Sequence, residues 1–185
     1  PAAFAFIGAL ALADWLGWIE LRPVDLLAAL TYTVNFLPEP SWDIGHLWSL
    51  SVEEQFYLLW PLALARLGVR RGAWVALAFF IAAPLVRTAM RLGFESSVMQ
   101  DLPIFPAVCD GIAIGCLFAI GRPWLLRQQQ YLWFTASAWM LGLVPLIFAI
   151  HHLSSGYTLA DLLGYPVMLL AIATIVEAST RWRTQ

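Results

Sequence analysis

Apolar residues run through this chain in long blocks, and polar residues gather in the short stretches between them. The blocks that reach the length of a membrane-crossing helix, about 17–25 residues, are 2–19, 46–67, 73–92, 102–120, 130–150 and 159–178. A further apolar stretch, 25–37, is shorter and precedes the turn-rich sequence PEPSWD, so we expect a re-entrant or interfacial segment there. The pattern predicts an all-α fold, a polytopic transmembrane helical bundle with about six spanning helices.

Composition extends this prediction to the whole chain. Of the 185 residues, 61% are hydrophobic and 12% are charged, whereas a soluble domain has about 45–50% apolar and about 25% charged residues. No stretch resembles a linker between domains, so we expect a single integral-membrane domain over residues 1–185. A net charge of −2 without a basic stripe argues against a nucleic-acid partner and leaves membrane lipid as the expected surroundings.

Arginine placement predicts the orientation, since the chain contains no lysine. Cytoplasmic connections of membrane proteins carry an excess of basic residues. If 25–37 does not span, one side of the predicted bundle holds Arg66, Arg70, Arg71, Arg122, Arg127, Arg181 and Arg183. We therefore expect that side to be cytoplasmic. Arg22 and Arg91 lie on the other side near span ends, where arginine side chains can snorkel to water.

The sequence GHLWSLSVEEQFYLLWP, residues 45–61, places polar groups inside an apolar block. One interpretation is a capping box, in which Ser51 is the N-cap of a helix that begins near Val52 and Glu54 reaches back to the Ser51 amide. This interpretation gives Ser51 and Glu54 structural roles. It leaves Glu53 without one.

The alternative interpretation begins the helix near His46. Four polar residues then lie on one face at spacings i, i+3, i+7 and i+11, namely His46, Ser49, Glu53 and Tyr57. An ionisable residue at membrane depth costs about 2.5–3.5 kcal/mol and is expected to face a cavity or a partner. This face, the polar stripe, is therefore a candidate functional site.

Two other ionisable residues lie within the predicted spans. Arg87 is near the end of its span, where it either snorkels outward or pairs with Glu53 to hold helices together. Asp110 is at mid-span, too deep to reach water by snorkelling, so it should meet water or a cation. Cys109 and Cys116 are two helical turns apart, cannot bridge, and are expected to be packing thiols. No residue spacing matches a metal site.

The stretch from His46 to Pro61 resembles the signature of the acyltransferase 3 family of membrane acyltransferases, H-x-W-S-L-S-V-E-E-Q-F-Y-L-x-W-P, without a break. Upstream, TYTVNFL (31–37) resembles the segment that usually precedes it. Downstream, CDGIAIGCLFA (109–119) is similar to the family's R-x-D-x-L-x-x-G-x-L-x-A helix. Val108 stands where arginine is common in that helix, which puts an anion-holding role of the helix in question.

The resemblance implies a membrane O-acyltransferase that moves an acyl group, usually acetyl, from acyl-CoA as co-substrate to a hydroxyl of a carbohydrate or glycolipid acceptor. Modification of lipopolysaccharide or exopolysaccharide at a bacterial inner (plasma) membrane would fit. No bound cofactor or metal is expected. The resemblance implies catalytic roles for Glu53 and His46, and contacts with substrate for Ser49, Ser51, Glu54, Gln55, Tyr57, Arg87 and Asp110.

The chain covers only the middle of the family pattern. The first residue, Pro1, would correspond to the end of the family's R-x-x-R-x-x-P segment. The helix that carries the family's histidine base and the closing S-Y-x-x-Y-x-x-H motif have no counterpart here. We therefore expect residues 1–185 to be an internal fragment that is inactive when isolated.

Two other classes of function suit the same residues. In a transporter or flippase, Glu53, Arg87 and Asp110 would form an intramembrane pathway. Transporters tend to show repeated halves with paired helix breaks, and the sequence shows none. In a membrane scaffold without catalysis, the polar stripe would serve helix association alone.

Overall fold

The computed structural model describes residues 2–154 and 158–182, and every regular element within these ranges is helical. Pro1 and Arg183 lie outside the described residues. The elements are α1 (Ala2–Trp15), α2 (Pro23–Leu30), η1 (Val34–Phe36), α3 (Trp42–Gly45), α4 (Trp48–Gly93), α5 (Ser97–Gln100), α6 (Phe105–Val108), α7 (Asp110–Leu125), α8 (Gln129–Ala136), η2 (Ala138–Gly142), α9 (Leu143–Ser154) and α10 (Thr158–Trp182). The all-α prediction is confirmed.

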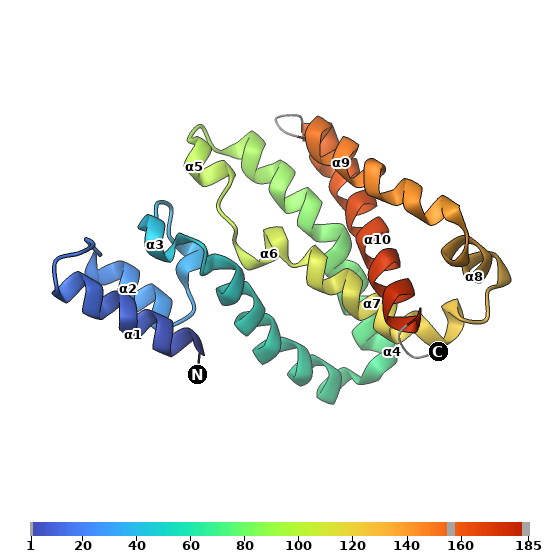
Figure 1. Cartoon of the computed structure of the whole chain (residues 1–185), viewed down its shortest axis with the longest axis horizontal. Coiled ribbons are helices and arrows are strands. Elements are labelled where there is room, and N and C mark those ends of the chain that lie inside the picture. The colour runs from blue at the N-terminus through green and yellow to red at the C-terminus, as the bar shows by residue number, and fades with distance from the viewer. Residues whose placement is uncertain (1, 155–157, 183–185) are drawn as a thin grey trace.

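The N-terminal elements form a group of their own at one end of the molecule (Figure 1). Their core consists of Ile7, Ala28, Ala29, Val34, Ile44 and Leu47. Segment 25–37 is divided between α2 and η1, and neither is long enough to cross a bilayer. Its position at a membrane interface stays a prediction.

A C-terminal cap ends α1 at Trp15. Gly17 has φ +72°, its N–H donates to the Asp14 carbonyl, and the Trp18 N–H donates to the Ala13 carbonyl. These are the two hydrogen bonds of a Schellman motif, which favours glycine at the left-handed position. The predicted span 2–19 is therefore a helix of 14 residues.

Gly68 divides the long helix α4 into two arms. Its φ of 74° and ψ of 167° are outside the helical region. Figure 1 shows the first arm running down and the second arm doubling back. The two arms are close next to the bend. A Cβ added at Gly72 would lie 2.5 Å from Leu64 Cδ2. The predicted boundary between blocks 46–67 and 73–92 coincides with this break.

Replacement of Gly68 by alanine should destabilise the fold by about 1–3 kcal/mol, because its backbone conformation is one that essentially only glycine adopts. The measurement is the midpoint of thermal unfolding in detergent. Gly121→Ala is the matched control, since Gly121 lies within α7 with nothing within 4 Å of the added Cβ. Equal midpoints for the two variants would show that the bend does not depend on glycine.

Helix α4 packs with α6, α7 and α10, and α9 packs along α10. The core between the arms and α6 contains Val52, Phe56, Ala83, Phe105 and Cys109. Cys109 is buried and Cys116 half-buried, and both are free thiols, in line with the predicted packing role.

The structure bears out fewer than the six predicted spans. By length and composition, two of the described helical segments could cross a membrane, Trp42–Gly93 and Leu162–Arg181. A third is added if α8 and the segment Ala138–His152, which meet at a bend of 70°, form one span. A count of spans from apolar length alone is too high, because apolar length does not show where a helix ends or bends.

Local breaks account for the missing spans. Besides the early end of α1, Ser137 adopts an extended conformation between α8 and η2. Block 102–120 is divided at Cys109 into α6 and α7, and α7 has 16 residues, which is short for a span. Block 159–178 lies within α10, a helix of 25 residues.

The basic clusters lie toward one end of the molecule. The bend of α4, the end of α7 and the end of α10 are all at the lower side in Figure 1. An ion pair of 3.4 Å between Arg122 of α7 and Glu177 of α10 joins two of these ends. The arrangement agrees with the predicted grouping of arginines on one side. Its assignment as cytoplasmic stays a prediction.

Candidate functional site

The beginning of α4 excludes the capping box. The helix begins at Trp48 with Leu47 as N-cap, and no side chain caps it. Ser51 is therefore already inside the helix, where its buried hydroxyl donates to the Leu47 carbonyl at 3.0 Å. A serine within a helix commonly bonds back to the carbonyl four residues earlier. The interpretation with a helix start near His46 is closer to the structure, although His46 itself ends the short helix α3.

The four residues of the polar stripe are all exposed. The Tyr57 hydroxyl donates to Glu53 Oε2 at 3.5 Å, and the Ser49 hydroxyl donates to the His46 carbonyl at 3.3 Å. The first distance is at the limit for a hydrogen bond. The Glu53 carboxylate is therefore held loosely and is accessible to a partner.

His46 is the residue of the stripe that contacts α1. Its ring meets the edge of Phe6 from α1, with 5.5 Å between centroids. Both residues line a cavity of about 580 Å³ together with Trp42 and Asp43. The cavity places an imidazole and a carboxylate on the walls of a space large enough for a small ligand.

Gln55 faces the N-terminal group. Its amide N–H groups donate to the Tyr32 carbonyl at 3.0 Å and to Asn35 Oδ1 at 2.9 Å. Asn35 is fully buried and donates to Gln55 Oε1 at 3.4 Å. The two amides pair reciprocally and join η1 to α4. Gln55, a predicted substrate contact, thus has a structural partnership, and the sequence prediction missed Asn35.

Arg87 and Asp110 form a buried ion pair. Arg87 Nη2 lies 2.7 Å from Asp110 Oδ2, and their side chains are 16% and 5% exposed. Arg87 Nη1 also donates to the Ala107 carbonyl at 2.5 Å, and the Tyr165 ring lies 5.2 Å from the guanidinium carbon. Asp110 meets a cation, as expected. Arg87 neither snorkels outward nor pairs with Glu53, so both of those alternatives are wrong.

The predicted site residues therefore separate into two groups. The exposed group is the polar stripe, whereas the second group, Arg87 and Asp110, is buried between α4 and α7. Glu54 belongs to neither group. Its side chain is half-buried, and its carboxylate forms no hydrogen bond or ion pair with another described residue. Trp48 is next to both groups. It directly precedes Ser49 in the sequence, and it lines a cavity together with Arg87.

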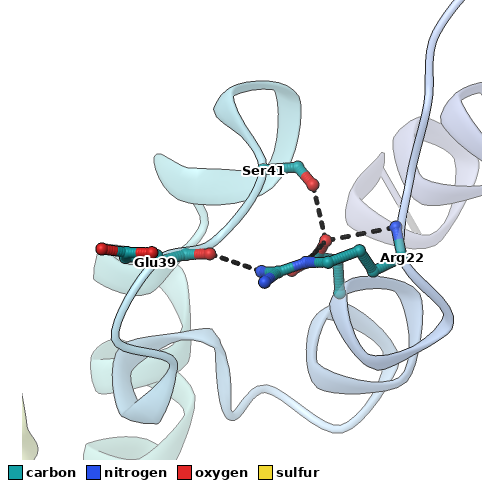
Figure 2. Close-up of polar contacts among 4 residues, drawn as sticks. Arg22, Glu39 and Ser41 are labelled. Atoms are coloured by element: carbon teal, nitrogen blue, oxygen red, sulfur yellow. Dashed lines mark hydrogen bonds and ion pairs between the residues drawn. The ribbon is translucent and has the colours of Figure 1, made fainter.

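A polar cluster at the start of α2 was missed by the sequence prediction (Figure 2). Asp25 is fully buried. The Arg22 guanidinium donates to both of its carboxylate oxygens at 2.8 Å, and the Ser41 hydroxyl donates to Oδ2 at 2.5 Å. Arg22 also donates to the Glu39 carbonyl. The cluster joins α2 to the segment that leads into α3, which positions the His46 cavity.

The pKa of Asp25 is well below its ordinary value, chiefly because of the hydrogen bonds from Arg22 and further because of Ser41. A lowered pKa means that the ionised carboxylate stabilises the fold above the unfolded-state value of about 3.9. That contribution is lost as the pH falls through the folded-state pKa.

Asp25→Asn should consequently lower the thermal unfolding midpoint at neutral pH, and its difference from the wild type should shrink below about pH 4. The measurement is a series of unfolding curves from neutral to acid pH. Asp43→Asn is a control, since Asp43 forms no ion pair with another described residue. A difference for Asp25→Asn that stays constant through the acid range would contradict the role of this carboxylate.

A further missed carboxylate is Glu177 of α10, which is 6% exposed. It accepts a hydrogen bond from the Tyr131 hydroxyl at 2.7 Å and one from Arg122 Nε at 3.4 Å. Nearby, Arg181 donates to Thr135 at 2.6 Å. These contacts fix the end of α10 to α7 and α8.

Comparisons with protein families, curated proteins and solved structures find no match for this chain. The resemblance of residues 46–61 to the acyltransferase 3 signature therefore stays a prediction. No group of three or more histidine, cysteine, aspartate or glutamate side chains in the described ranges is placed to hold a metal ion.

Sequence signals for the missed residues differ in strength. The order Arg22-Pro23-Val24-Asp25 is a usable signal, because proline is favoured at the first helical position and an acid two residues later can bond back to the preceding amide. Asn35 and Glu177 have no comparable local signal. Their partners lie 20 and 46 residues away in the chain.

Proposed function

We propose that the protein is an integral-membrane O-acyltransferase, which transfers an acyl group from acyl-CoA to a hydroxyl of a carbohydrate or cell-surface glycan. The observation that carries the proposal is the unbroken match of His46 to Pro61 to the family signature. Two described segments long and apolar enough to cross a membrane agree with a membrane location.

Transfer to a hydroxyl requires a base for its proton and a dipole or cation for the oxyanion that develops. In the proposed mechanism Glu53 positions the acceptor hydroxyl or orients a histidine that acts as the base. His46 is the histidine of the matching stretch, and it lies on the wall of the cavity shared with Phe6 and Asp43.

The exposure of the polar stripe supports this assignment. Glu53 lies on a helix in which neighbours such as Leu58 and Leu59 are also exposed. A carboxylate on an apolar surface at membrane depth is expected to face a cavity or a partner. We propose that the stripe forms one wall of the reaction site, and that acyl-CoA approaches from the side with the basic clusters.

The test is to incubate the full-length protein in nanodiscs with acetyl-CoA labelled in the acetyl group and a panel of glycan acceptors. Label recovered in covalent linkage on an acceptor supports the proposal. The transporter alternative draws on the buried Arg87–Asp110 pair, since ionisable groups at membrane depth often mark a transport pathway. It predicts instead that a labelled glycan crosses the membrane of a proteoliposome chemically unchanged.

A further inference from the structure

A second cavity, of about 230 Å³, is lined by the start of α4 and its second arm, by α5, α6 and the segment between them, and by α10. Its polar and aromatic wall consists of Trp48, Arg87, Arg91, Gln100, Asp101 and Tyr165. Apolar walls with a few convergent polar groups are typical of small-molecule sites. The cavity is separate from the one beside His46, and the proposed chemistry at Glu53 does not use it.

Arg87 carries an unused hydrogen-bond donor. Its two terminal nitrogens are bound to Ala107 and Asp110, whereas the buried Nε has no hydrogen-bond partner. Buried polar groups in folded proteins nearly always have a partner. The Arg87 guanidinium on the cavity wall therefore has a hydrogen-bonding capacity that its protein partners leave unfilled.

The cavity wall offers one guanidinium whose partner is exposed. The wall holds two guanidiniums and one carboxylate, but Arg87 is already paired with the buried Asp110, so Arg91 is the group that would take a ligand's negative charge. The carboxylate on the wall, Asp101, is 68% exposed, and its distance to Arg91 is long for an ion pair, at 3.4 Å. Exposed ion pairs of this kind are weak, so the carboxylate of a ligand could replace Asp101 at Arg91. Guanidinium groups match planar carboxylates through paired hydrogen bonds. A carboxylate therefore fits better than a doubly charged phosphate.

The aromatic residues and the size of the cavity indicate what bears the carboxylate. Trp48 is 38% exposed, and Tyr165 packs on Arg87, so two rings border a polar group. The volume is below the roughly 300–1,000 Å³ of larger ligand pockets and suits one ring with its substituent. A neighbouring cavity of about 510 Å³ shares Trp48, Asp101, Leu102 and Pro103. That space would admit the rest of a saccharide.

We propose that this cavity binds the carboxylate of an acidic saccharide, with Arg91 as its anion-binding group. That the saccharide is the acyl acceptor rests on the function proposed above. Trp48 directly precedes Ser49 of the polar stripe, so a saccharide anchored by its carboxylate at Arg91 would lie beside the start of α4.

Equilibrium binding to the full-length protein in nanodiscs, measured by calorimetry without acyl-CoA, tests the site. The probes are glucuronate, its neutral counterpart glucose, and glucose 6-phosphate. We expect glucuronate to bind about tenfold or more tightly than glucose, because a charge-assisted hydrogen bond is lost in the neutral sugar. Arg91→Gln should weaken glucuronate binding by a similar factor, and Arg127→Gln, at an exposed position, should leave it unchanged.

Arg91→Lys provides a second variant that keeps the positive charge without the planar fork. It should bind glucuronate with intermediate affinity if the pairing is bidentate, and its thermal unfolding shows whether it folds. Equal binding of glucuronate and glucose would overturn the proposal, as would full affinity in Arg91→Gln. Tighter binding of glucose 6-phosphate than of glucuronate would overturn the choice of a carboxylate.

The outcomes separate this site from the proposed enzyme activity. Glucuronate binding that depends on Arg91, in a protein that transfers no acyl group, would support the site and remove the acyltransferase. Acyl transfer to acidic and neutral glycans alike that is unaffected by Arg91→Gln would keep the acyltransferase and overturn the role of the site in holding the acceptor.

Discussion

Replacing Arg87 by glutamine is expected to destabilise the protein by about 3–5 kcal/mol, since removal of one partner leaves an uncompensated buried charge. The Asp110 side chain is only 5% exposed, and the described residues offer its carboxylate no other cation at ion-pair distance. The substitution would also remove the hydrogen bond to the Ala107 carbonyl, which joins α4 to α6. The measurement is the unfolding midpoint in denaturant, with purified protein in detergent.

The partner substitution sharpens this test. Asp110→Asn alone should also destabilise the protein, whereas the double variant Arg87→Gln with Asp110→Asn should be more stable than the Arg87→Gln single variant, because neither charge is then left unpaired. Arg127→Gln is the control for loss of an arginine at an exposed position. A midpoint for Arg87→Gln equal to that control would contradict the structural importance of the pair.

Glu53→Gln should lower the rate of acyl transfer by about 10²-fold or more, in the range that a positioned acid or base contributes. The substitution keeps the shape of the side chain and removes its charge. Stability should change little, since Glu53 is exposed and its hydrogen bond with Tyr57 is 3.5 Å long. Initial rates at saturating acetyl-CoA and acceptor give the comparison.

Glu39→Gln is the matched control for Glu53. Glu39 is also exposed, and its backbone carbonyl, not its side chain, accepts the hydrogen bond from Arg22. Its variant should retain the wild-type rate. A Glu53→Gln protein as active as this control would remove Glu53 from the mechanism while leaving the enzyme in place.

Much of the fold follows from short-range patterns in the sequence. Long apolar blocks predicted an all-helical chain, and the break at Gly68 falls between two of those blocks. The number of spans did not follow, because it depends on single residues that end or bend a helix. Gly17 in a Schellman motif and the extended Ser137 are such residues, and an apolar average over a window of about 20 residues does not register them.

The candidate site shows the same division. Ser49, Glu53 and Tyr57 are exposed residues of α4 at the predicted spacing, because a helix fixes the neighbours of a residue within a few positions. His46 is also exposed, but it lies before α4, at the end of α3. The partner of Arg87 could not be found in this way, since Asp110 lies 23 residues further along the chain. The capping box failed for a related reason. Ser51 has a suitable local sequence, but α4 begins earlier, at Trp48.

The most direct test of the central claim is acceptor-dependent release of CoA from acetyl-CoA by the full-length wild-type protein in nanodiscs. An O-acyltransferase should release free CoA only when a hydroxyl-bearing glycan is present, and the glycan should gain one acetyl ester for each CoA released. No release with any acceptor in the panel, by a protein shown to be folded by its cooperative unfolding, would contradict an O-acyltransferase.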